Sequence, residues 1–155
     1  MSVRKRNDLE KETLKFDVIG LVSTYKEYKV AWYLNKFFDI NLIKKKDEEV
    51  RLVDSSCVKI SFLEFKIGKK HIKLISNKLK NSSRTYLISS LSNFDFLILF
   101  SKNFFEFKDY DIIDRLKTNN TFQFANFVDI TKLKDKYFLS LWVKIKLIEQ
   151  KSLQQ

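Results

Sequence analysis

The chain has 155 residues and a net charge of +11, with one cysteine, two glycines and no proline. This length is typical of one domain, and a hydrophobic content of 45% suffices for a core without metal or disulfide cross-links. A lone cysteine excludes an internal disulfide, and neither a secretory signal nor an apolar run of about 20 residues is present. We therefore expect a cytoplasmic protein with no membrane segment.

Lysine supplies most of the positive charge, with 25 Lys against 5 Arg. Clustered cations bind nucleic-acid phosphates, but Arg, the residue best suited to bidentate phosphate contacts, is scarce. An AT-rich genome would also produce a chain rich in Lys and Phe and poor in Gly and Pro. The charge thus has two explanations, function and genome composition, and the sequence leaves both open.

The predicted organisation has three parts: a flexible basic N-terminal arm over residues 1–13, a single domain over 14–148 and a C-terminal tail over 149–155. The first element of the domain is a strand over Leu14–Val22, where apolar side chains alternate. Thr24 stands three residues before Glu27, the spacing of a capping box. This pair predicts a helix over Tyr25–Phe38.

The predicted helix has a broad apolar arc and an opposite polar face. The arc comprises Val30, Leu34, Phe37 and Phe38 together with Tyr28, Ala31 and Trp32, and the opposite face carries Lys26, Lys29, Tyr33 and Lys36. Asn35 falls inside the arc, and a buried amide needs a hydrogen-bond partner. We expect Asn35 to tie the helix to a neighbouring strand or loop.

Strands dominate the middle of the chain. The charged segment 41–53 contains a short edge strand, and in Cys57–Ile67 the apolar alternation slips by one residue near Phe62, which predicts a β-bulge or bend. Gly68 opens a tight turn into His71–Asn77, so these two strands form a hairpin.

After a loop over residues 80–84, a strand through Phe94–Ser101 is apolar on both faces, as expected of a central strand covered on both sides. Phe94, Phe96, Ile98 and Phe100 share one predicted face. Asp95 is the one carboxylate that the sequence places where burial is expected, and a buried carboxylate must be paired. A structural role at the start of the strand is favoured over catalysis.

The last third of the domain begins with an acidic cluster, Asp109, Asp111 and Asp114. The cluster would stand at the N-terminus of a helix that runs to about Thr118, and this position explains the carboxylates without a metal ion. Strands follow at Phe122–Ile130 and Tyr137–Leu147. The order β-α-β-β-β-β-α-β-β predicts an α+β fold with a largely antiparallel sheet and about two helices.

Several chemistries lack their residues. One histidine, His71, and one cysteine, Cys57, are too few for a zinc site, and nothing organises His71 for nucleophilic catalysis. Two glycines leave no phosphate-binding loop. The sequence therefore predicts no catalytic residue, no metal ligand and no cofactor.

The segment ISSLSNFDF, Ile88–Phe96, resembles the motif of the IPExxxVDY family, bacterial proteins of Bacteroidota without an established function. Ile88 and Asp95 match the motif, Phe96 stands for its Tyr and Phe94 for its Val. The residues at 89 and 90 are both Ser, in place of Pro and Glu. This loss argues either that position 90 is not an indispensable catalytic acid here or that this member has lost what the family does.

Three further segments support the resemblance, which spans roughly residues 14 to 100: FDVIG at 16–20, YKVAWYLNK at 28–36 and ISNK at 75–78. The resemblance implies a bacterial cytoplasmic protein. Its motif residues, to which we assign a structural role, are Asn35, Asn77, Lys78, Ile88, Asp95 and Phe96.

The leading hypothesis is a non-enzymatic protein that contacts RNA or an RNA-processing or ribosomal assembly. The predicted contacts fall in loops or at polar strand ends, where an extended anion could reach several at once: Lys44, Lys45, Lys46, Lys69, Lys70, Lys144 and Lys146. The alternative is an interaction module for an acidic protein partner. A third hypothesis, an enzyme, requires a pocket that joins Asp95, Asn35 and either Asn77 or Lys78.

Overall fold

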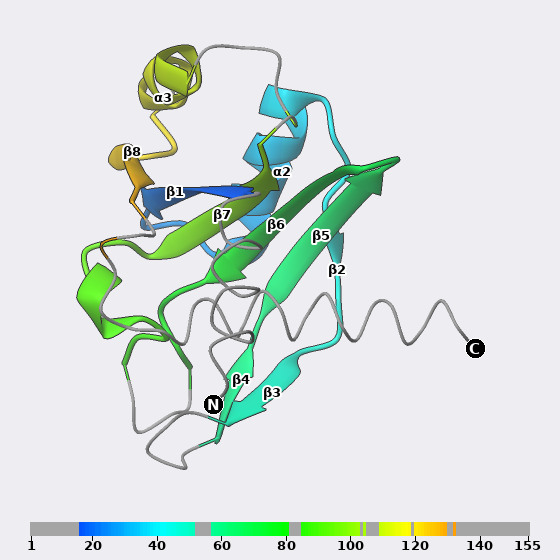
Figure 1. Ribbon diagram of the computed structural model, residues 1–155. Helices are drawn as coiled ribbons and strands as arrows, with labels where there is room; N and C mark the ends of the chain where they lie inside the picture. The colour runs from blue at the N-terminus through cyan, green and yellow to red at the C-terminus, as the bar shows by residue number, and fades with distance from the viewer. Residues whose placement is uncertain are drawn as a thin grey trace.

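The structure is a computed structural model that describes residues 16–51, 57–80, 85–102, 104, 109–118, 120–129 and 132. Its elements are shown in Figure 1. In chain order they are β1 (Phe16–Val22), α2 (Glu27–Phe38), β2 (Ile43–Lys44), β3 (Glu48–Arg51), β4 (Cys57–Ile60), β5 (Phe62–Ile67), β6 (Lys70–Ser76), the 3-10 turn η1 (Ser89–Leu91), β7 (Phe96–Ser101), α3 (Asp109–Lys117) and β8 (Phe124–Val128).

Six of these strands form one sheet in the order β2-β5-β6-β7-β1-β8, and β3 pairs with β4 in a second, two-stranded sheet. Every pairing is antiparallel. The predicted α+β fold with an antiparallel sheet and two helices is therefore confirmed. The predicted central strand is β7, which lies between β6 and β1 and is buried from Phe96 to Phe100.

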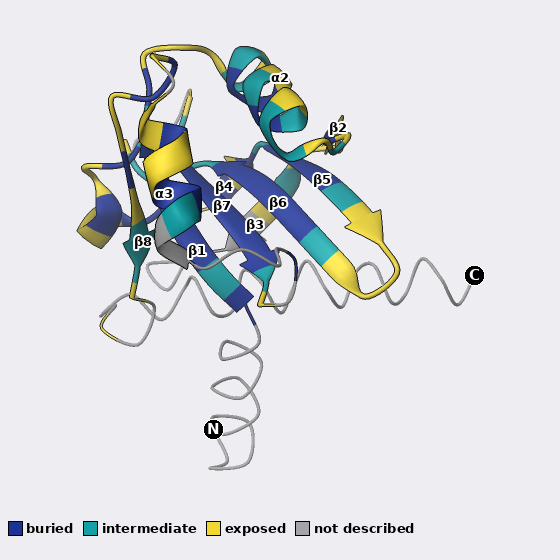
Figure 2. Cartoon of the chain, turned by 90° about the horizontal axis from the view of Figure 1, so that it is seen from above, coloured by how far each residue is buried: buried dark blue, intermediate teal, exposed yellow. Residues whose placement is uncertain are grey.

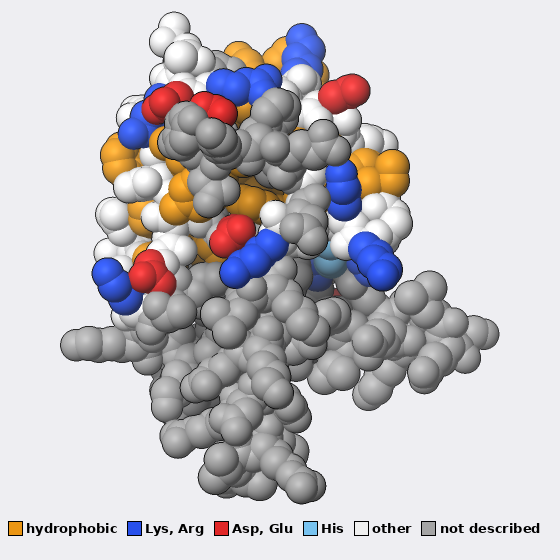
Figure 3. Space-filling model, turned by 45° about the horizontal axis from the view of Figure 1, so that its top comes forward, with side chains coloured by type: hydrophobic (Ala, Val, Ile, Leu, Met, Phe, Trp, Pro, Cys, Tyr) orange, Lys and Arg blue, Asp and Glu red, His pale blue; other side chains and the backbone are white. Residues whose placement is uncertain are grey.

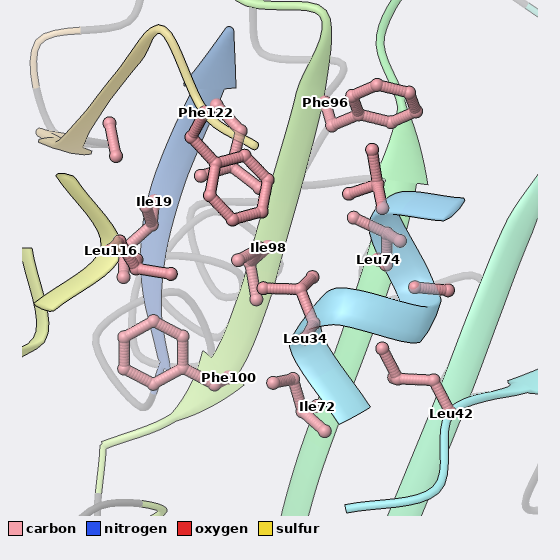
Figure 4. Close-up of a cluster of buried hydrophobic side chains, with 14 of the residues drawn as sticks. Ile19, Leu34, Leu42, Ile72, Leu74, Phe96, Ile98, Phe100, Leu116 and Phe122 are labelled. Carbon is pink, nitrogen blue, oxygen red and sulfur yellow. The ribbon is translucent and has the colours of Figure 1, made fainter. Parts of the chain in front are cut away.

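Both helices cover one face of the six-stranded sheet. Val30, Ala31 and Leu34 of α2 and Ile112, Ile113 and Leu116 of α3 join one buried cluster with side chains of β1, β6 and β7. Figure 4 shows Leu34 directed at the strands beside Ile72 and Ile98. Burial of such aliphatic side chains stabilises the fold by roughly 1.5–3 kcal/mol each.

The opposite face is covered by β4 and by the segment that leads into β7. Val58 and Ile60 of β4 form a second buried cluster with Leu97, Leu99 and side chains between Leu87 and Phe94. Phe94 belongs to this cluster, so it does not share a face with Phe96 as its alternation predicted. The reason is that β7 begins only at Phe96, and the period-two rule does not extend to residues before the strand. The Phe94 ring lies directly over Gly20, where any Cβ would overlap it.

The predicted register slip near Phe62 is confirmed. Ser61 separates β4 from β5, which belong to different sheets. Phe62 packs in the same cluster as Val58 and Ile60, whereas Leu63 packs under the helices. The hairpin of β5 and β6 is also confirmed, and Gly68 takes a φ of 58° in its two-residue turn, a conformation that favours glycine.

The start of α2 differs from the prediction. The helix begins at Glu27, and no side chain caps it. The Glu27 carboxylate instead accepts hydrogen bonds from the hydroxyls of Ser61 and Ser76, at 2.9 and 2.6 Å. These tertiary partners replace the local capping box with Thr24.

The apolar arc predicted for α2 was too wide. Tyr28 and Trp32 are exposed, because a helix on a flat sheet needs only the narrower arc through Val30, Leu34 and Ala31. Ile67 is also exposed, because it lies at the tip of the β5–β6 hairpin.

The helix predicted from Asp109 and the strand predicted from Phe122 correspond to α3 and β8. The predicted arm, the strand over Tyr137–Leu147 and the tail lie outside the described residues. Among those that are described, no helix is both long and apolar enough to cross a bilayer.

Candidate functional site

Asn77, a residue of the motif, is fully buried and holds the segment that leads into β7. Its amide nitrogen donates to the carbonyl oxygens of Leu91 and Phe94, at 2.9 and 3.0 Å. Its amide oxygen accepts from the backbone N–H of Ile88 at 3.0 Å. The motif is therefore a corner of the backbone folded around one amide, with Ile88 and Phe96 buried in it.

Asp95 lies at the same corner and is half-buried. Its carboxylate accepts a hydrogen bond from the backbone N–H of Ser23 at 3.0 Å, and its carbonyl oxygen accepts from the N–H groups of Asn77 and Lys78. The carboxylate thus joins the end of β1 to the start of β7, which is the structural contact expected from the sequence.

The remaining motif residues lie apart from this corner or point away from it. Asn35 accepts a hydrogen bond from the N–H of Leu42 at 2.8 Å, as expected of an amide that ties α2 to a loop. Asn35 lies about 12 Å along α2 from Glu27. Glu27 is the residue of α2 that accepts a hydrogen bond from Ser76, the neighbour of Asn77 in the chain. Lys78 is exposed. Among the described residues, Asn35 makes no hydrogen bond to Asp95, Asn77 or Lys78, the groups that the enzyme hypothesis would join in one pocket.

Lys44 is held in a network of ion pairs and hydrogen bonds. Its ammonium group donates to the Ser61 hydroxyl at 2.6 Å and to the Asp47 carboxylate at 3.0 Å, and it lies 3.6 Å from the carboxylate of Glu27. Lys44 is therefore a structural link between β2 and the first turn of α2. Its role as a contact for an external anion stays a prediction, and its ammonium group already has partners within the chain.

The other predicted lysine contacts do not form one cluster. Lys45 and Lys46 are exposed after β2, and Lys69 and Lys70 are exposed in the β5–β6 turn. The backbone N–H of Lys45 donates a hydrogen bond to the carbonyl oxygen of Phe62 at the start of β5. The pair Lys45 and Lys46 is therefore separated from the pair Lys69 and Lys70 by the length of β5, about 17 Å. Lys144 and Lys146 lie outside the described residues. Figure 3 shows Lys and Arg side chains dispersed over the visible face.

A different group of side chains stands out on the outer side of α2. Tyr28 is 72% exposed and Trp32 is 50% exposed, at i and i+4 on one ridge. Figure 2 shows that exposed positions of α2 face away from the sheet. The Lys36 ammonium lies 4.0 Å from the centre of the Trp32 ring, and Tyr33 meets the same ring edge to face at 5.0 Å.

Exposed apolar side chains concentrate at this place. Six large apolar side chains are exposed among the described residues. Four of them lie just before α2, in α2 or in β2: Tyr25, Tyr28, Trp32 and Ile43. The contact between Lys44 and Glu27 fixes β2 beside the start of α2. We define the α2–β2 surface as Tyr25, Tyr28, Lys29, Trp32, Tyr33, Lys36, Lys45 and Lys46.

The sequence contains a signal for this surface that the predicted apolar arc did not take into account. An apolar arc that includes both Leu34 and Trp32 spans about 160° of the helix, more than one face of a sheet can cover. Aromatic rings next to Lys29 and Lys36 at the edge of that arc are the side chains that can remain in water.

A group of buried charges was also missed. The Glu64 carboxylate lies 3.4 Å from the ammonium of Lys73, which is fully buried, and 3.3 Å from the imidazole of His71. Glu64 and Lys73 are opposite each other on β5 and β6. In the sequence, Glu64 and Lys73 alternate with apolar residues, a pattern typical of a strand with one solvent-exposed face. The sequence therefore did not indicate that these two side chains are buried.

Within the described part of the chain, no three His, Cys, Asp or Glu side chains gather as a metal site would require. Comparison with protein-family models, with curated proteins and with solved structures found no match for this chain.

Proposed function

We propose that this protein is a non-enzymatic RNA-binding protein and that its α2–β2 surface meets RNA, free or within an RNA-processing or ribosomal assembly. The observation that carries the proposal is the concentration of exposed aromatic rings and lysines on one helix and the adjoining loop. Proteins that bind single RNA strands combine these two kinds of side chain, cations for the phosphates and rings for the bases.

The lysines of the surface are available to phosphates. Lys45 and Lys46 are exposed and make no ion pair with another residue in the described ranges. The ammonium groups of Lys29 and Lys36 lie over aromatic rings, at 4.1 Å from the centre of the Tyr25 ring and 4.0 Å from the centre of the Trp32 ring. Four lysines can thus contact a backbone that crosses this face.

The side chains of this surface also bear on the alternative, an acidic protein partner. Cores of protein interfaces share its aromatic residues but are depleted in Lys. The cations of the α2–β2 surface are all lysines, but Lys also outnumbers Arg 25 to 5 in the whole chain. We therefore place RNA first because rings and lysines occur together, and not because of the kind of cation.

The resemblance to the IPExxxVDY family stays a prediction and is compatible with this proposal. The motif residues Asn77 and Asp95 hold a backbone corner, whereas most of the α2–β2 surface lies in the segment 28–36, which also supports the resemblance. A shared motif would then preserve the fold of the family rather than a catalytic group.

The test is the affinity of the full chain for a single-stranded RNA across salt concentrations. Four phosphate contacts predict that log K falls with log salt with a slope of about −3. The double variant Lys45→Ala/Lys46→Ala should weaken binding about tenfold and reduce the slope by about 1.4, without a change in sequence preference.

The matched control is Lys59→Ala/Lys102→Ala, which removes the same charge from exposed positions on β4 and after β7. It should alter affinity less than threefold. Equal losses in the two double variants would show that net charge alone attracts RNA, and no binding at low salt would remove the proposed function. Lys69 and Lys70 should matter only for RNA long enough to follow β5 to its turn.

A further inference from the structure

The α2–β2 surface carries exposed aromatic rings as well as lysines. Lys44 is neutralised by Glu27 and Asp47, and two more carboxylates, Glu48 and Glu49, begin β3. The carboxylates around Lys44 offset part of the attraction of this loop for phosphates. A ligand that binds this face can gain further free energy from the rings.

From the placement of these rings we infer that Tyr28 and Trp32 form a stacking platform for two bases of a single-stranded RNA. This inference rests on the proposed function and names its ligand class. Tyr28 is the more open ring, and within the described residues it makes no ring contact and no hydrogen bond. Removal of a ring that stacks on a base weakens binding by roughly tenfold or more.

The spacing of the two rings selects the form of the RNA. Residues at i and i+4 are about 6 Å apart along a helix axis. Stacked bases of a duplex are about 3.4 Å apart and cover each other's faces. Two bases that use Tyr28 and Trp32 must therefore belong to an extended strand whose bases are unstacked, and a duplex offers none.

The lysines around the platform suit the phosphates that follow such bases. Lys36 lies over the Trp32 ring, and its flexible chain can turn to a phosphate next to a base on the exposed half of the indole. Tyr33 packs edge to face against Trp32 and limits the orientations of the indole. The platform is therefore partly ordered before RNA arrives, which lowers the entropic cost of binding.

The experiment uses the full chain with Trp142→Phe, so that Trp32 is the only tryptophan. The probe is a uridine hexamer, because its bases stack weakly on one another. Its titration should quench the fluorescence of Trp32 to saturation. A duplex RNA of the same length should bind at least tenfold more weakly and leave the fluorescence unchanged.

Two variants separate stacking from charge. Tyr28→Leu should weaken hexamer binding about tenfold, because leucine has no π face on which a base can stack. The slope of log K against log salt should stay unchanged, because the substitution removes no charge. Tyr28→Phe is the matched control and should bind within twofold of the parent. Tyr28 is exposed, so neither variant should change the unfolding midpoint.

The outcomes distinguish this inference from the proposed function. Salt-dependent binding of the hexamer that is indifferent to Tyr28→Leu, or that leaves Trp32 fluorescence unchanged, would overturn the platform and retain RNA binding. Absence of hexamer binding would remove both. Poly-glutamate serves as an acidic polypeptide, and binding as tight as that of the hexamer would assign the surface to an acidic protein instead.

Discussion

Asn77 shows what a single side chain contributes to this fold. Its amide satisfies two backbone carbonyl groups and one N–H group of the corner between Ile88 and Phe94, and it is fully buried. Backbone groups in the interior cost about 1–3 kcal/mol each when their partner is removed. The position therefore carries a large part of the stability of the corner.

We expect Asn77→Ala to lower the free energy of unfolding by about 4 kcal/mol, because it leaves three buried backbone groups without this partner. Urea denaturation measures the effect. Asn93→Ala is the control, since Asn93 is exposed, and it should cost less than about 0.5 kcal/mol. A loss below about 1 kcal/mol for Asn77→Ala would contradict the role of this amide.

Single residues were only partly predictable from the sequence. Asp95 was expected to be a paired carboxylate, and it accepts a backbone hydrogen bond from Ser23. The partner itself could not be predicted, because β1 and β7 meet only in the folded sheet. The resemblance marked Asn77 as a structural residue, but its three partners could not be predicted, since they lie 11 to 17 residues away in the chain.

The strand pair β5–β6 carries the buried ion pair of Glu64 and Lys73 across the sheet. Such a pair contributes little net stability relative to apolar side chains of the same size, but removal of one partner leaves a buried charge. The effect of a substitution here therefore depends on whether one or both residues change.

The single variants Lys73→Met and Glu64→Leu should each lower the free energy of unfolding by about 3–5 kcal/mol. The double variant Glu64→Leu/Lys73→Met should recover most of that loss, because both charges of the pair are removed together and the volume is retained, while His71 loses its contact with Glu64 in this variant as in Glu64→Leu. Guanidinium denaturation of the three proteins measures the coupling between the two positions. Additive losses in the double variant would rule out a pairwise interaction.

Elements with a strong local pattern were predicted well. The helix α2, the hairpin at Gly68 and the central strand β7 follow from period, turn residue and apolar content, all of which are local. The faces of these elements were predicted less well. Tyr28 and Trp32 were assigned to the core because hydrophobicity does not reveal how wide a surface the sheet offers α2.

At the scale of the whole molecule, the positive charge does not identify a binding face. Lys and Arg side chains are dispersed over the face seen in Figure 3, and Lys44 serves an internal network. Dispersed lysines agree with the amino-acid usage of an AT-rich genome. The combination of lysines with exposed rings on the α2–β2 surface carries the functional proposal, and the net charge of +11 does not.

The most direct test of the central claim is a map of the RNA-binding face by nuclear magnetic resonance of the 15N-labelled full chain, titrated with the uridine hexamer. The largest amide shifts should fall between Tyr28 and Lys36 and at Lys45 and Lys46, with small shifts in α3 and at the Gly68 turn. Shifts that gather on α3 or at that turn, with α2 unchanged, would contradict the account.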